Sequence, residues 1–391
     1  IQTRSSTLLI RAATLSIAVL LCALLGAGWW YVWRPMPEVE GTIAAPLSAA
    51  ATISRDSIGV AHVAAATWQD AIFLQGYVTA QDRMWQMDGV RRLASGELSE
   101  VIGKDSLETD RQARRLRLNR IAEAQEKSLS PASREILAAY ARGVNYYLET
   151  HRDRLPPEFA ILGYSPRPWR VRDSLLALLE MQRELTNSWR DELSKRHMLS
   201  VGKHEKVDLL YPPKATVPLT PGSNAWVISG AHTASGKPLL SNDPHLQWNL
   251  PSTWYMIHLQ AANLDVSGFA LPGIPAVLIG HNRNIAWGMT NLGYDVQDLV
   301  EEKIELATGR YVKNGRFEQA RLERDTILVK GERAVELDTW ITSDGPAFVS
   351  DEGHMYALRW SAESLSWNGL AMAKNTGCSM CAVSTICSLT S

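Results

Sequence analysis

The chain has 391 residues, of which 46% are hydrophobic and 21% are charged. These proportions are ordinary for a globular protein, and the length allows a large hydrophobic core. The formal net charge of -1 gives no electrostatic basis for binding nucleic acid, so we expect no nucleic-acid partner.

Residues 1–34 are predicted to be a signal anchor or a signal peptide. Residues 12–33 are almost wholly apolar, follow Arg4 and Arg11, and end in a run of aromatic residues. A run of about 20 apolar residues with these flanks is typical of a membrane-spanning helix. A cleaved signal peptide usually has a shorter apolar region and a small-x-small site, which residues 23–28 lack. We therefore expect an exported, periplasmic or extracytoplasmic protein anchored in the inner membrane.

The next two segments are predicted to be a linker over residues 35–50 and a helix-rich region over residues 51–201. One or two strands are expected within residues 51–63. Helices are expected over residues 71–92, 111–120 and 172–199, from the spacing of their apolar residues. The charged residues of the first helix are interpreted as structural ion pairs or a solvated face; they include Asp82, Arg83, Arg91 and Arg92.

Residues 202–222 contain proline and lysine without a periodic apolar stripe, and they are predicted to be a spacer. Beyond them the pattern changes to short strands and tight turns. Strands are expected over residues 225–229, 238–241, 253–261, 265–269, 276–280 and 285–288. Helices before this point and strands after it predict an α+β architecture.

Ser223 lies where the two patterns meet, in Gly222-Ser223-Asn224, just before an apolar, β-prone run. A serine hydroxyl needs a base to take its proton, and a chain-terminal amine has a pKa of about 7.7–8.0. Cleavage of the bond between Gly222 and Ser223 would place nucleophile and base on one residue. By itself, however, such a tripeptide is more often an ordinary turn.

Four separated motifs strengthen the catalytic interpretation. They are RDSIGVAH at 55–62, GYVTAQDRMWQM at 76–87, RRLASGELSE at 91–100 and AHTASGKPLLSNDPHL at 231–246. In this order they resemble the penicillin acylase family of N-terminal nucleophile hydrolases. The resemblance implies a four-layer αββα sandwich, here incomplete, and two chains cut from one precursor. The helix-rich region would be the α-chain, residues 202–222 the spacer removed or nicked, and residues 223–373 the start of the catalytic β-chain.

The same resemblance implies roles for residues around the nucleophile. The block GHNRNIAWGMTN at 280–291 is similar to a family segment whose last residue, here Asn291, gives a backbone N–H to the oxyanion hole. His245 falls where the family has a polar residue beside the nucleophile, and with Asn224 it would orient the serine or its amine. From local pattern alone, Asn291 is a turn residue and His245 is as readily structural.

A calcium site is also implied by the resemblance. Asp295, Gln297 and Asp298 match the family's calcium-binding segment, in which oxygen atoms are the ligands. Glu192 is the expected carboxylate from the α-chain, with Glu184 as the second candidate. The alternative is that the two aspartates form a cap or a solvated turn.

The last part of the chain departs from the family pattern. The family's second oxyanion donor is a side-chain Asn, accompanied by an arginine, and both lie farther along than this sequence extends. Residues 374–391 are rich in cysteine and lack the expected continuation. Our hypothesis is a frameshift or truncation near Lys374, with residues 374–391 as an aberrant tail.

These observations predict a self-processing amidohydrolase that acts on a small acylated amine. Candidate substrates are penicillins, N-acyl homoserine lactones and related N-acyl amines. One alternative is a conventional serine or metal hydrolase, although neither Gly-x-Ser-x-Gly nor His-Glu-x-x-His occurs in the chain. The other is a non-catalytic, membrane-tethered, truncated remnant of such an enzyme.

Overall fold

A computed structural model describes residues 2–186, 188–211, 223–291, 296–351, 354–364 and 383–388. The helices are α1 (Gln2–Gly28), α2 (Trp68–Ser95), α3 (Ser99–Ile102), α4 (Leu107–Arg115), α5 (Leu118–Ser128), α6 (Pro131–Thr150), α7 (Pro157–Leu162), α8 (Val171–Leu185), α9 (Ser188–Val201) and α10 (His204–Leu210). The first strands are β1 (Thr52–Arg55), β2 (Ala61–Ala64), β3 (Asn224–Ile228), β4 (Leu239–Asp243), β5 (Tyr255–Ala261), β6 (Leu264–Ala270), β7 (Ile279–Asn282) and β8 (Ile285–Thr290). The remaining strands are β9 (Gln297–Glu305), β10 (Arg310–Lys313), β11 (Arg316–Gln319), β12 (Arg321–Ile327), β13 (Val335–Thr342), β14 (Gly345–Asp351), β15 (His354–Trp360) and β16 (Val383–Ser388).

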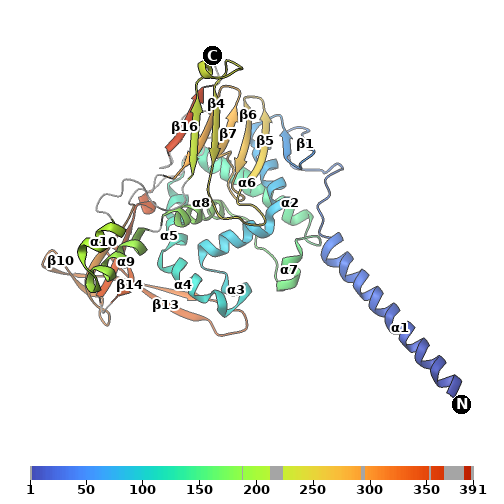
Figure 1. Ribbon diagram of the computed structural model, residues 1–391, viewed down its shortest axis with the longest axis horizontal. Helices are drawn as coiled ribbons and strands as arrows, with labels where there is room; N and C mark the ends of the chain where they lie inside the picture. Colours follow the sequence, from blue (N-terminus) through green and yellow to red (C-terminus); the bar gives the residue numbers. More distant parts are fainter. Residues whose placement is uncertain are drawn as a thin grey trace.

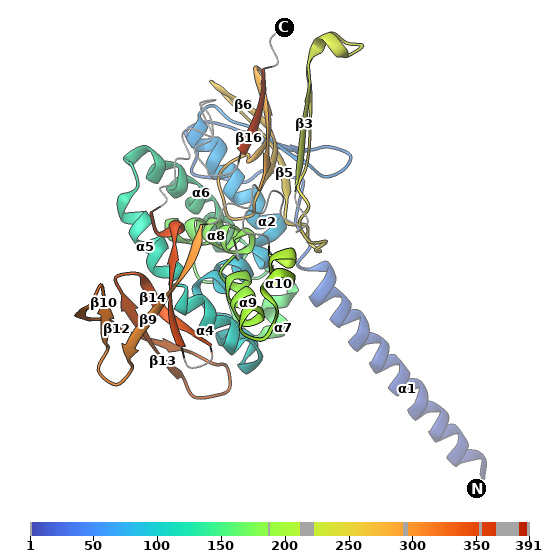
Figure 2. The same cartoon turned by 60° about the vertical axis from the view of Figure 1, so that its left-hand side comes forward.

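The strands of the described part form two seven-stranded sheets and one hairpin. The first sheet has the order β1-β2-β5-β6-β7-β8-β16, the second has the order β11-β10-β9-β15-β14-β13-β12, and β3 pairs with β4. Helices α2, α6 and α8 lie beneath the first sheet, and the second sheet lies to one side of them (Figure 1). The β3–β4 hairpin stands on the side of the first sheet away from α6 (Figure 2). The four-layer sandwich itself stays a prediction.

The first sheet joins sequence from both sides of Ser223. Strands β2 and β5 pair in parallel, whereas the other neighbours in this sheet are antiparallel. His62 lies opposite His258 in this register, and their Nδ1 atoms are 3.0 Å apart. Tyr255, Ile257 and Leu259 alternate along β5 and are buried, which is the period of a strand with one face on the core. The mixed α/β arrangement thus contains strands in the regions where the sequence predicts them, within residues 51–63 and 225–288, whereas the sequence predicts none of the seven strands of the second sheet.

Two glycines let α2 and α6 pack closely. A Cβ atom at Gly76 would lie 2.2 Å from the Tyr140 carbonyl oxygen, and one at Gly143 would lie 1.8 Å from the Phe73 carbonyl oxygen. No side chain larger than hydrogen fits either position without moving a backbone. The crossing therefore depends on glycine for space, and it brings the apolar faces of both helices into one core with β5.

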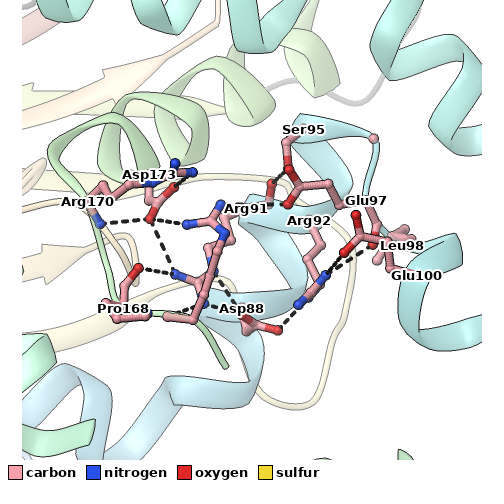
Figure 3. A network of polar contacts seen from close by, with 12 residues as sticks. Asp88, Arg91, Arg92, Ser95, Glu97, Leu98, Glu100, Pro168, Arg170 and Asp173 are labelled. Carbon is pink, nitrogen blue, oxygen red and sulfur yellow. Dashed lines mark hydrogen bonds and ion pairs between the residues drawn. The ribbon is translucent and has the colours of Figure 1, made fainter. Parts of the chain in front are cut away.

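A buried ion-pair network joins α2 to the start of α8 (Figure 3). Arg91 lies between two carboxylates: its Nη2 is 2.5 Å from Asp88 Oδ1 and its Nη1 is 3.3 Å from Asp173 Oδ2. Arg92 Nε adds a contact of 2.9 Å to Asp88 Oδ2. The side chains of Asp88, Arg91 and Asp173 are fully buried, so the interpretation as ion pairs is confirmed for Arg91 and Arg92 and that as a solvated face is wrong.

Two of the predicted helices are each divided into two. The helix expected over residues 111–120 is interrupted at Arg117, whose φ of 60° is left-handed and whose guanidinium pairs with Glu323 at 2.9 Å. The helix expected over residues 172–199 ends at Leu185, because Thr186 is extended, and α9 begins at Ser188. Apolar spacing continues through both breaks, so periodicity alone could not show them.

The segments expected to be irregular carry more structure than predicted. Residues 204–210 of the predicted spacer form α10, which buries Val207, while residues 212–222 lie outside the described part. Residues 35–50 run along α2 and α6: the Ala44 carbonyl accepts a hydrogen bond from Tyr146, and Ser48 donates one to Asp70. These contacts fix the segment to the protein surface.

The apolar N-terminal segment forms one long helix that projects from the rest of the protein (Figures 1 and 2). Over Leu9–Trp33 it is long and apolar enough to cross a membrane, and none of these residues is buried in the rest of the protein. A signal sequence has the same properties, so the helix indicates export or membrane anchoring without distinguishing them.

Candidate active site

Ser223 is half-buried and directly precedes β3. Its hydroxyl oxygen accepts a hydrogen bond from the backbone N–H of His245 over 3.3 Å. The hairpin brings these residues together, because Asn224 pairs with Asp243 at the open end of the β3–β4 ladder. Gly222 lies outside the described residues, so the bond that would be cut is described only from its serine side.

The imidazole of His245 is held by a neighbouring carboxylate. Its Nε2 lies 2.8 Å from Asp243 Oδ2, and both side chains are partly exposed. Because a carboxylate only accepts hydrogen bonds, this contact places a proton on Nε2. The hydrogen bond from His245 holds the pKa of Asp243 below its ordinary value, so the carboxylate stays ionised. The sequence analysis singled out His245 and missed Asp243 as its partner.

Asn291 follows the last residue of β8, a strand that lies against the β3–β4 hairpin. Its side-chain Nδ2 donates a hydrogen bond of 3.0 Å to the carbonyl oxygen of Leu185, the last residue of α8. The half-buried Asn242 connects β8 with β3: its amide hydrogen-bonds the Asn224 carbonyl and both backbone groups of Met289. Asn242 is the main residue that the sequence analysis missed, although an asparagine inside a strand is itself an unusual choice.

The loop between β4 and β5 is anchored by α2. Arg83 Nη1 and Gln86 Nε2 both donate to the Ser252 carbonyl oxygen, at 2.7 and 3.0 Å. Arg83 adopts a non-helical φ of −139° within α2, which kinks the helix at this point. Asp82, the residue before Arg83, accepts hydrogen bonds from Arg55 at 2.9 Å and from the Tyr255 hydroxyl at 2.6 Å. These contacts confirm the structural interpretation of Asp82, and they support the loop that carries His245.

The residues expected to bind calcium come partly together. Glu192 Oε2 accepts a hydrogen bond of 3.0 Å from the Leu299 N–H, so this carboxylate lies beside the start of β9. Gln297 is buried, and its Oε1 has no hydrogen-bond partner among the described residues, whereas Asp298 is exposed. Asp295 lies outside the described residues. Within the part that the structure describes, no group of three or more His, Cys, Asp or Glu side chains could hold a metal ion.

Comparisons with protein families, curated proteins and solved structures all find similarity to penicillin amidases and related acylases. The family model for penicillin amidase matches residues 50–387. An acyl-homoserine lactone acylase of Pseudomonas aeruginosa is 31% identical over 82% of this chain and 42% of its own length. A penicillin acylase 2 proenzyme of a Pseudomonas species is 29% identical over 83% of this chain and 47% of its own length. A solved penicillin G acylase chain of Alcaligenes faecalis is 30% identical, covers 44% of this chain and 96% of its own, and has a TM-score of 0.38. The chain thus spans less than half the length of these curated relatives.

Proposed function

The chain belongs to the penicillin amidase family, and we propose that it is a self-processing acylase whose nucleophile is the hydroxyl of Ser223. The observation that carries this proposal is the 3.3 Å hydrogen bond from the His245 N–H to Ser223 Oγ at the head of β3. A backbone donor at this distance fixes the direction in which the oxygen's remaining lone pair points. It supports a role in positioning the attacking atom.

The proposed reaction begins when the bond before Ser223 is cut and its nitrogen becomes an amine. The amine takes the hydroxyl proton as Ser223 Oγ attacks the amide carbonyl, and the backbone N–H of Asn291 stabilises the oxyanion. The proton then passes to the departing amine, which leaves an acyl ester on the serine. Water attacks this ester by the same route and releases the carboxylic acid. Asn224 and His245 orient the reacting groups, and Asp243 holds the His245 ring.

We propose N-acyl homoserine lactones as the substrate class, with penicillins and other N-acyl amines as the next candidates. The names of three matched relatives at 31–33% identity support this order, since each is an acyl-homoserine lactone acylase. Penicillin acylases match at 29% and 25%. In each case the bond broken is a linear amide.

The proposal includes two chains from one precursor, as the word proenzyme in the name of one relative suggests. Strand β2 comes from the proposed α-chain and β5 from the proposed β-chain, so their parallel pairing would hold the two together after cleavage. The long apolar helix supports export to the periplasm, with this helix as an inner-membrane anchor.

We also propose a structural calcium ion bound by oxygen atoms of Glu192, Asp295, Gln297 and Asp298. Two observations on β9 support this site. The side-chain oxygen of Gln297 is buried and has no hydrogen-bond partner among the described residues, and two residues along the strand Leu299 donates its N–H to Glu192. A hard cation would satisfy such an oxygen. Its expected contribution is to fix α9 against β9, away from the reacting atoms.

The test is the intact mass and N-terminal sequence of the expressed chain beside a Ser223→Ala variant. A new chain that begins at Ser223 in the parent only, together with hydrolysis of an N-acyl homoserine lactone, is the expected result. A parent that stays whole and inactive while folded would contradict the proposal. That outcome would favour the non-catalytic, membrane-tethered alternative.

A further inference from the structure

The side chain of Asn242 joins β4 to both β3 and β8. It lies on β4, opposite Ala225 of β3. Its Nδ2 donates to the Asn224 carbonyl oxygen at 2.7 Å and to the Met289 carbonyl oxygen at 3.0 Å, and its Oδ1 accepts from the Met289 N–H at 3.0 Å. The side chain thus pairs with both backbone groups of Met289, as a neighbouring strand would.

The orientation of this amide follows from its partners. Two carbonyl oxygens require a donor, and one N–H requires an acceptor. Exchanging the nitrogen and oxygen of Asn242 would break all three hydrogen bonds. Neither a carboxylate nor a hydroxyl could make the same set, so asparagine is the residue type that the junction needs.

Gly288 provides the space for this contact. A Cβ atom at Gly288 would lie 2.8 Å from both Cβ and Cγ of Asn242 and 2.9 Å from its Oδ1. Gly288 is not among the glycines with positive φ, so its backbone conformation does not require glycine. The requirement is steric: any larger residue would push Asn242 away from β8.

The junction connects the two groups that must cooperate in acyl transfer. Asn224 directly follows Ser223, and Met289 is two residues before Asn291. The hairpin and the first sheet are otherwise separate sheets. We propose that Asn242 is a positioning residue that fixes the separation between the Ser223 hydroxyl and the Asn291 backbone N–H. This inference rests on the proposed function, because it assigns those groups their roles.

The expected effect is on the chemical step rather than on substrate binding. An oxyanion donor acts only when it is aimed at the developing charge, and a displacement of about 1 Å can cost about 100-fold in rate. Asn242→Ala should therefore lower kcat by about 10- to 100-fold while KM changes by less than about threefold. Gly288→Ala should act in the same direction with the Asn242 side chain still present.

The test uses the full chain with an N-acyl homoserine lactone as substrate, and it measures kcat, KM and hydrogen exchange of the Met289 amide. Asn282→Ala is the matched control: the Asn282 side chain accepts from the N–H groups of Asn284 and Ile285 at 2.7 and 2.9 Å, at the far end of β8. This control should lose stability and keep kcat. In Asn242→Ala the Met289 amide should exchange faster than in the parent.

Two results would overturn the inference in an active parent: a kcat of Asn242→Ala within twofold of the parent, or an equal fall of kcat in Asn282→Ala. A parent without cleavage or hydrolysis would instead contradict the proposed function. Hydrogen exchange of the Met289 amide would then still show whether Asn242 holds β8 in place. A Met289 amide that exchanges equally fast in the parent and in Asn242→Ala would show that the Asn242 hydrogen bond does not hold β8.

Discussion

The side-chain amide of Asn291 donates a hydrogen bond of 3.0 Å to the carbonyl oxygen of Leu185. Leu185 ends α8, before the proposed cleavage point, and Asn291 follows β8, after it. The bond therefore ties the proposed oxyanion residue to the other chain. Anchoring the side chain also restrains the backbone N–H of the same residue, which would have to stay directed at the oxyanion.

Asn291→Ala keeps the backbone N–H and removes its anchor, so we expect a moderate fall in kcat. Asn291→Pro removes the N–H itself, and loss of one such donor typically costs about 10²- to 10³-fold. Steady-state hydrolysis of an N-acyl homoserine lactone by the two variants measures the difference. If alanine were as harmful as proline, the side chain rather than the N–H would be the important group.

The buried network around Arg91 should contribute strongly to stability. Arg91→Met removes the cation that lies between the buried carboxylates of Asp88 and Asp173. Removing one partner of a buried ion pair typically costs about 3–5 kcal/mol. Because Asp88 keeps Arg92 and Asp173 keeps Arg167, we expect a loss at the lower end of this range, about 3 kcal/mol. Guanidinium denaturation should show this loss. Arg111→Met, at the exposed pair with Glu108, is the control and should change the free energy of unfolding by less than about 1 kcal/mol.

Acid should weaken the same network. Burial alone would raise the pKa of Asp88, but the charges of Arg91 and Arg92 outweigh it and hold this pKa below its ordinary value. The folded protein then binds fewer protons at Asp88 than the unfolded chain does. Its contribution is fully present above the unfolded pKa of about 3.9 and is lost as pH falls through the lower folded pKa.

We therefore expect the difference in free energy of unfolding between the parent and Asp88→Asn to be constant from about pH 7 to pH 5 and to shrink below about pH 4. Urea denaturation of both proteins across this range measures the difference, and other carboxylates cancel in the comparison. A difference that stayed constant down to pH 2 would mean that Asp88 titrates alike in the folded and unfolded chains.

The sequence could predict the features that depend on neighbouring residues. Apolar spacing gave α2 and the strands β3 to β8, but none of the strands of the second sheet. The resemblance singled out Ser223 and His245, which the hydrogen bond between them now links. Contacts between residues far apart in the sequence leave no periodic pattern or motif from which they could be predicted. Arg117 breaks a helix because its left-handed backbone turns its guanidinium to Glu323, more than 200 residues away. Asn242 pairs with Met289 for the same kind of tertiary reason.

The proposed calcium ion gives a prediction that needs no enzyme activity. If Glu192 and Gln297 help to bind calcium, then calcium chloride should raise the Tm of the parent relative to EGTA, since a ligand of the folded state stabilises it. Glu192→Gln should abolish most of this difference. Glu205→Gln, which changes an exposed glutamate on α10, should keep it. An equal response of Tm to calcium in the parent and in Glu192→Gln would remove Glu192 from the site.

The crossing of α2 and α6 predicts opposite effects for the same substitution at two glycines. Alanine is favoured over glycine inside a helix by about 1 kcal/mol. At Gly89 of α2 a Cβ atom would meet nothing within 4 Å, so Gly89→Ala should stabilise the protein by about this amount. At Gly143 of α6 the same atom would lie 1.8 Å from the Phe73 carbonyl oxygen.

Gly143→Ala must therefore separate the two helices, and the helix preference cannot compensate for the core contacts that are lost. Overpacking of this kind typically costs about 1–3 kcal/mol, and here the obstacle is backbone, which cannot rotate aside. Guanidinium denaturation should show a lower midpoint for Gly143→Ala and a higher one for Gly89→Ala. If Gly143→Ala also stabilised the protein, α2 and α6 could not cross as closely as Gly76 and Gly143 indicate.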